Sequence, residues 1–165
     1  MKTSVVSALI LACFPAAALA MDNHVVQQPD ALKWGAAPPS LPLGSEVAVL
    51  YGDPSSAGPY AVRVRMPADY KVPPHTHPTA ENLTVISGSF NVGMGGTFDT
   101  AKGEPMAPGA FARMEKGEQH YAWASGPTVI QINGMGPFEI IYVNPADDPR
   151  SAAAKGPGDA TTGSK

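Results

Sequence analysis

The sequence contains very little cysteine, since Cys13 is the only one among 165 residues. Cys13 lies in an apolar amino-terminal run, so removal of that run would leave a chain without disulfides or a cysteine nucleophile. Charge is also scarce: charged residues make up 15% of the chain and the formal net charge is −3. No basic patch is available to neutralise phosphates, which argues against binding to nucleic acid.

Long apolar runs are missing beyond the first 20 residues, where none approaches the ~18 residues that a membrane-spanning helix needs. No segment shows convincing amphipathic helical periodicity either. What the chain does contain is 18 prolines and 17 glycines, which punctuate about ten short apolar segments at roughly 8–12 residue spacing. This pattern predicts an all-β protein, and a double-sheet jelly roll fits it best.

The amino terminus has the pattern of a signal peptide over residues 1–20. Lys2 supplies a positive start, residues 5–14 are apolar, and Ala18-Leu19-Ala20 resembles a signal-peptidase site. We expect cleavage before Met21 and a periplasmic or secreted protein, with no membrane attachment afterwards. Lipoprotein processing at the lone cysteine is the alternative.

Composition divides the rest of the chain into three parts. Residues 21–34 are predicted to form an N-terminal arm, and His24 in it is expected to be solvated. Residues 35–146 carry the strand-like segments and are predicted to form one barrel. Residues 147–165 are rich in Asp, Pro, Ala, Gly, Ser and Lys, which predicts a disordered tail.

The clearest strand signal is the alternation in residues 60–66, where Val62, Val64 and Met66 fall on one face and Arg63 and Arg65 on the other. One face is therefore expected to be buried and the other solvated. The other predicted strands are residues 46–51, two strands within 82–92 around a turn at Gly88, and residues 110–114, 121–123, 128–132 and 138–143.

Three of the four histidines fall into a pattern that predicts a metal site. His75 and His77 are two apart, so in a strand both point to the same side. Glu81 lies at a further even offset, and His120 can join from a later strand. Two prolines before His75 stiffen the approach. Three imidazoles and a carboxylate suit one divalent Fe, Mn, Ni, Cu or Zn ion, with affinity falling below about pH 6 as the imidazoles protonate.

Two motifs in this region resemble the signatures of the cupin superfamily. The first is His75-x-His77-x3-Glu81-x6-Gly88, and the second is Gly109-x5-Glu115-x-Gly117-x2-His120. The resemblance implies a double-stranded β-helix barrel in which His75, His77, Glu81 and His120 bind the metal.

The sequence departs from the cupin pattern at three positions. Asp69 replaces a glycine, Glu115 a proline and Ala124 an asparagine. None of the three is a metal ligand in the family, so the departures concern turn geometry.

The resemblance implies a metal-dependent enzyme, dioxygenase-like or lyase-like, that acts on a small organic molecule. Glu81 would serve as ligand and as catalytic base, and Arg113, Gln131 and Tyr142 are candidate substrate contacts. Two alternatives stay open: a non-catalytic protein that binds a metal or small ligand, and a cupin-type isomerase. Exposed strand edges and the family resemblance favour a homodimer.

Overall fold

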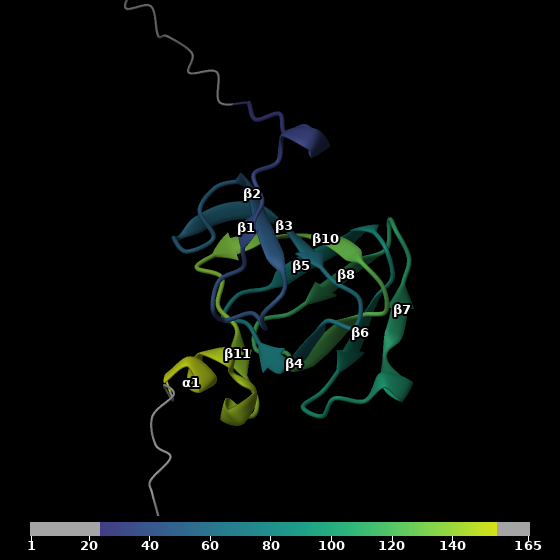
Figure 1. Ribbon diagram of the computed structural model, residues 1–165. Helices are drawn as coiled ribbons and strands as arrows, with labels where there is room; N and C mark the ends of the chain where they lie inside the picture. Colours follow the sequence, from purple (N-terminus) through teal and green to yellow (C-terminus); the bar gives the residue numbers. More distant parts are fainter. Residues whose placement is uncertain (1–23, 155–165) are drawn as a thin grey trace, which may run out of the picture.

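Two antiparallel β-sheets form the framework of the computed structural model, which describes residues 24–154 (Figure 1). The predicted signal peptide and its cleavage site lie outside these residues. Within the described part, no helix is long and apolar enough to cross a membrane.

Both sheets are antiparallel throughout. The six-stranded sheet has the order β1 (Gly35–Ala36), β2 (Glu46–Tyr51), β3 (Gly58–Met66), β10 (Thr128–Gly136), β5 (Glu81–Ser87), β8 (Phe111–Met114). The five-stranded sheet has the order β11 (Ile141–Tyr142), β4 (Lys71–Thr76), β9 (His120–Ala124), β6 (Phe90–Met94), β7 (Glu104–Met106). From β3 to β6 and from β8 to β11, successive strands alternate between the sheets. This is a jelly roll, so the predicted fold class is confirmed.

The helical segments are short and lie outside the sheets. Three are 3₁₀ turns, at Pro29–Ala31, Thr100–Lys102 and Pro145–Asp147, and the fourth is α1 (Pro149–Ala154). The prediction of disorder from residue 147 onward is wrong for α1. Arg150 holds this segment by binding the Asp148 carboxylate at 2.8 Å and donating to the Ile140 carbonyl at 3.0 Å.

One predicted strand is shorter than expected. Of residues 138–143, only Ile141–Tyr142 pair in a ladder. The preceding backbone is used elsewhere: the Phe138 N–H donates to the Pro54 carbonyl, and the Glu139 carbonyl accepts from the His77 ring. Backbone groups satisfied in this way cannot also join a sheet.

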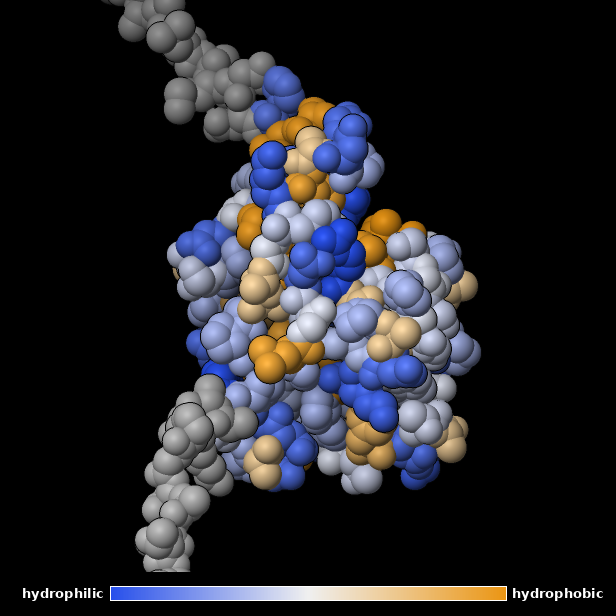
Figure 2. Space-filling view, in the orientation of Figure 1, coloured by the Kyte–Doolittle hydropathy of each residue, from blue (hydrophilic) through white to orange (hydrophobic). Residues whose placement is uncertain are grey.

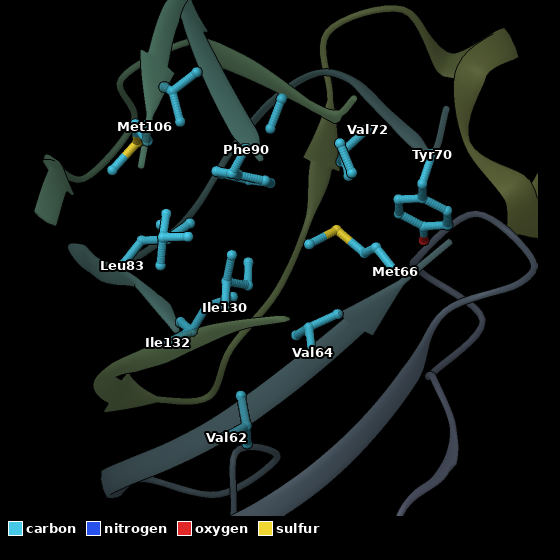
Figure 3. Close-up of a cluster of buried hydrophobic side chains, with 14 of the residues drawn as sticks. Val62, Val64, Met66, Tyr70, Val72, Leu83, Phe90, Met106, Ile130 and Ile132 are labelled. Atoms are coloured by element: carbon cyan, nitrogen blue, oxygen red, sulfur yellow. The ribbon is translucent and has the colours of Figure 1, made fainter. Parts of the chain in front are cut away.

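The inner faces of the two sheets enclose the hydrophobic core. Val62, Val64 and Met66 on β3 are buried as their alternation predicts, while Arg65 points outward to Glu46 and stacks on Trp34. Figure 3 shows these side chains meeting residues from the opposite sheet, such as Phe90 and Val72. Outside, the visible face is mainly polar with scattered apolar residues (Figure 2).

Asp69 sits in the turn before β4 with a φ of 60°, the only non-glycine residue with positive φ in the described chain. Its N–H donates to the Ala124 carbonyl at 2.9 Å, which fixes this turn against β9. Aspartate tolerates the left-handed region better than most residues. Asp69 therefore adopts at this position a backbone conformation that glycine also favours.

This geometry generates a stability prediction for Asp69. Asp69→Ala should lower the free energy of unfolding by about 1 kcal/mol, because alanine lacks the short polar side chain that lets aspartate tolerate positive φ. Asp69→Gly should leave it unchanged or raise it. Urea unfolding of the two variants beside the wild type measures both values. Equal stability of the alanine and glycine variants would contradict the assigned strain.

Candidate metal centre

A bulge in β4 turns His75 toward the barrel interior. Between β4 and β9, Val72 pairs with Ala122 and His75 pairs with His120, so two residues on β4 oppose one on β9. Val72 and His75 are both buried and line the same cavity although their spacing is odd. The extra residue falls at the two prolines between them, which cannot donate to a ladder. The bulge therefore reverses the strand's phase just before the histidines.

The three histidines meet inside the barrel, as the sequence predicts. His75 is the penultimate residue of β4, His77 directly follows the strand, and His120 is the first residue of β9. One ring nitrogen from each lies within 4.8 Å of the others, and all three residues are buried. The ring of His77 also stacks on Phe138, with centroids 4.8 Å apart.

Glu81, the first residue of β5, brings a buried carboxylate to the same place. Its Oε2 lies 3.5 Å from His77 Nε2 and 3.6 Å from His120 Nε2. These separations exceed the 2.7–3.2 Å typical of hydrogen bonds. Accordingly, neither Nε2 atom has a hydrogen-bond partner in the described part of the chain.

Backbone carbonyls fix the orientation of every ring. The Nδ1 of His75 lies 2.7 Å from the Pro73 oxygen, that of His77 2.6 Å from the Glu139 oxygen, and that of His120 3.0 Å from the Glu118 oxygen. A carbonyl oxygen only accepts, so each Nδ1 carries a proton and donates. In a neutral imidazole the other nitrogen then has a free lone pair. All three Nε2 atoms are thus prepared as metal ligands.

The charges within the cluster follow from its burial. Burial, reinforced by the rings of His120 and His77, lowers the pKa of His75 to about 3, so this ring is neutral at physiological pH. Burial opposes ionisation of Glu81, but its interactions with His120 and His77 outweigh this and hold the pKa of Glu81 below its usual range. The pKa of His77 is raised, because the neighbouring Glu81 carboxylate outweighs the effect of burial.

When the imidazoles are neutral, as metal binding requires, their Nε2 lone pairs and the ionised carboxylate repel one another across an apolar interior. A divalent cation among them would satisfy all four groups at once. The donor set, nitrogen with one oxygen, is the one expected for Fe, Mn, Ni, Cu or Zn. The residues present therefore fit a transition metal.

A cavity of about 200 Å³ adjoins the cluster and runs into the hydrophobic core. His75, His77, Glu81 and His120 form part of its wall. Most of the remaining wall is made of apolar side chains, and a molecule in the cavity would have direct access to the imidazoles.

Two of the three predicted substrate contacts lie outside this cavity. Arg113 is on the outer face of β8, where it binds Glu115 at 2.7 Å and the Asn82 side chain at 3.0 Å. Gln131 is on the outer face of β10 and accepts from Arg63. The residues that face inward on these strands are Met114, and Ile130 with Ile132. The structure therefore does not bring these two residues to the histidine cluster, and their contact with a substrate stays a prediction.

Tyr142, the third predicted contact, is buried beside His75, with ring centroids 6.1 Å apart. Its hydroxyl donates to the Ser40 carbonyl at 2.8 Å. Tyr142 is not among the residues that line the cavity. It packs beside the ring of His75 outside the cavity lining.

Tyr60 and Phe138 lie near the cluster and were not predicted as site residues from sequence. Tyr60 lies on β3 and faces inward, as Val62 does two residues later. It is 2% exposed and packs against Phe138 with ring centroids 5.8 Å apart. Its hydroxyl has no hydrogen-bond partner among the described residues. Burial, and secondarily the charge of Glu81, raises the pKa of this hydroxyl well above its usual range. Alternation in residues 60–66 was the signal that could have identified Tyr60.

Comparisons with known proteins agree with this geometry. The family model of the ChrR cupin-like domain matches residues 22–139. No curated protein matches the sequence.

Similar folds occur among solved structures, each at low identity. The polyketide cyclase RemF from Streptomyces resistomycificus is 17% identical, with a TM-score of 0.58, over 78% of this chain and 92% of that chain. A candidate acetylacetone dioxygenase from Methylibium petroleiphilum is 19% identical, with a TM-score of 0.57, over 76% and 85%. An RmlC-like cupin from Shewanella frigidimarina is 12% identical, with a TM-score of 0.52, over 66% and 87%. These likenesses show a shared cupin fold.

The unpartnered hydroxyl of Tyr60 generates a second stability prediction. Tyr60→Phe should raise the free energy of unfolding by about 1 kcal/mol, because it removes a buried polar atom that lacks a partner. Tyr70→Phe is the matched control: it loses contacts with the Pro42 carbonyl at 2.6 Å and Ser45 at 2.9 Å, and should lower stability by about 1 kcal/mol. Urea unfolding gives both values. Equal destabilisation by the two changes would show that the Tyr60 hydroxyl has a partner.

Proposed function

Because this chain belongs to the ChrR cupin-like domain family, we propose that His75, His77, Glu81 and His120 bind one divalent transition metal, and that this centre transforms a small organic molecule. One observation carries the proposal. Three buried imidazoles are each anchored by a backbone carbonyl that accepts from Nδ1. Their Nε2 atoms are thereby left with free lone pairs, and they converge beside a carboxylate.

The protein's own groups have distinct roles at such a centre. The anchored imidazoles are held in the tautomer that binds a metal, which lowers the entropy lost when it binds. Glu81 contributes the only negative charge of the set and, once the three Nε2 lone pairs are bound to a metal, would be the one member that can accept a proton as a base. A bound metal would supply a Lewis acid or a site for oxygen. Four protein ligands do not fill an octahedral ion, so a substrate can also bind it.

A catalytic role is favoured over a purely structural metal because a cavity adjoins the cluster. Two structural relatives are described as a polyketide cyclase and a candidate acetylacetone dioxygenase, both of which act on small organic molecules. A dioxygenase-like or lyase-like reaction suits the ligand set. The isomerase alternative has less support, since among the described residues that line the cavity only Ser40 and Ser55 are polar beyond the proposed ligands.

Export to the periplasm or beyond, and assembly as a homodimer, belong to the same proposal. Export rests on the signal-peptide pattern of residues 1–20. Dimerisation rests on exposed edges such as β8, where Phe111 is 62% exposed. The intact mass of the purified protein tests whether residues 1–20 are removed, and analytical sedimentation tests whether the protein is a dimer.

The ligand set predicts the metal content of matched variants. His75→Ala and His120→Ala should each lose most of the stoichiometric metal measured by elemental analysis, whereas His24→Ala in the N-terminal arm should retain it. Glu81→Gln should weaken metal affinity by at least about tenfold, because it removes the ligand charge without changing shape. Glu115→Gln is the matched control, because the Glu115 carboxylate is exposed and pairs with Arg113.

Two results would contradict this assignment in different ways. Unchanged metal content in both histidine variants would remove the ligand set as a whole. Unchanged affinity in Glu81→Gln alone would leave a three-histidine site and exclude the glutamate.

The catalytic half of the proposal predicts turnover by the metal-loaded protein. With stoichiometric Fe, Mn, Ni or Cu, a panel of small enols, thiols and dicarboxylates should include a substrate that consumes oxygen or is cleaved without it. Oxygen uptake and mass spectrometry of products distinguish the dioxygenase-like from the lyase-like reaction. Tight metal binding with no turnover on any member of the panel would instead support the non-catalytic binding protein.

A further inference from the structure

The walls of the barrel cavity combine one polar cluster with an otherwise apolar surface. The polar cluster consists of the proposed metal ligands, and Ser40 and Ser55 add only hydroxyls. Val62, Val64 and Met66 follow one another along β3 and form part of the remaining wall (Figure 3). The volume of about 200 Å³ is somewhat larger than the roughly 150 Å³ cavity that holds a benzene molecule. A ligand of that size would touch hydrocarbon on most of its surface.

No lysine or arginine is among the described residues that line this cavity. The arginines on the adjoining strands are engaged outside: Arg63 with Gln131, Arg65 with Glu46, and Arg113 with Glu115. A carboxylate or phosphate group held away from the metal would therefore be buried without a counter-charge. Such burial is strongly unfavourable, so doubly charged ligands are selected against.

The charge of the centre sets the charge of the ligand that it favours. Three neutral imidazoles and the Glu81 carboxylate around a divalent ion sum to one positive charge, two minus one. A ligand with a single negative charge makes the centre neutral, which is the preferred state in an apolar interior. A dianion would leave a net negative charge there.

We propose that the site selects small molecules that have an apolar body and one oxygen-donor head which binds the metal as a monoanion, and that it rejects dicarboxylates, sugars and nucleotides. Enolised 1,3-diketones and hydroxyketones belong to this class. The inference rests on the proposed metal site and narrows its substrates. It also identifies the aliphatic wall, rather than any charged side chain, as the source of specificity.

Acetylacetone and malonate provide matched probes of this selectivity. The two molecules have the same number of non-hydrogen atoms and the same spacing of donor oxygens, but methyl groups in the first replace carboxylate oxygens in the second. The full-length mature protein, loaded with Co(II), is titrated with each by calorimetry and visible absorption. Acetylacetone should bind at least about tenfold more tightly than malonate. Equal or tighter binding of malonate would overturn the inference while leaving the metal site intact.

A variant pair on β10 tests the role of the wall. Ile132 lines the cavity, whereas Val129 lies on the same strand, half-buried and outside the cavity lining. Ile132→Phe should weaken acetylacetone binding by at least about tenfold without loss of Co(II), because the larger ring occupies the space for the ligand's body. Val129→Phe should leave acetylacetone binding unchanged. Equal effects of the two variants would overturn the assignment of the wall.

Toluene binding by the metal-free wild type separates the cavity from the metal and needs no substitution. Toluene should raise the melting temperature of the metal-free protein, as expected for a ligand that binds only the folded state. Absence of a shift would overturn the apolar cavity as a binding site. Failure of Co(II) to bind would overturn the proposed metal function, and the head-group preference with it, whatever the toluene result.

Discussion

The structure depends on one constraint: in the neutral form of the histidines that binds a metal, groups that only accept hydrogen bonds converge in an apolar interior. The Nε2 atoms of His77 and His120 face the Glu81 carboxylate, with no donor between them in the described part of the chain. Each unsatisfied buried group costs about 1–3 kcal/mol. A rigid barrel can tolerate this arrangement, and a bound cation would convert it from a source of instability into one of stability.

The groups that anchor the cluster come from the irregular parts of the fold. The carbonyl of Pro73 lies in the β4 bulge, that of Glu118 in the turn before β9, and that of Glu139 in a segment that pairs with no strand. Carbonyls in regular ladders are already occupied by neighbouring strands. The barrel must therefore break its hydrogen-bond pattern at three places to orient three rings. A further backbone hydrogen bond, from the Gly117 N–H to the His77 carbonyl, links the two histidine motifs.

Strand alternation and motif spacing were sufficient to predict the jelly roll and to bring the three histidines together. They were insufficient to predict which way the surrounding side chains point. Alternation shows only which residues share a face of a strand, and a bulge exchanges the two faces. Arg113 lies in a segment where apolar residues occupy both phases, so its outward direction was not evident from sequence. Gln131 lies between two buried isoleucines, and that signal was available. The shortened strand at Ile141 depends on hydrogen bonds to distant loops, which no local pattern encodes.

The cavity itself bears on what the site is for. At roughly 24 cal/mol per Å³ of unfilled space, about 200 Å³ corresponds to as much as about 5 kcal/mol of stability that a filled core would provide. A metal with a purely structural role requires no such space, since larger side chains at Val64 or Ile132 would fill it. The same side chains line the core and the cavity, so larger side chains that filled the cavity would also block a ligand's access to the metal. A barrel that keeps this space beside a polar cluster is better explained by a ligand that enters than by a metal that only stabilises the fold.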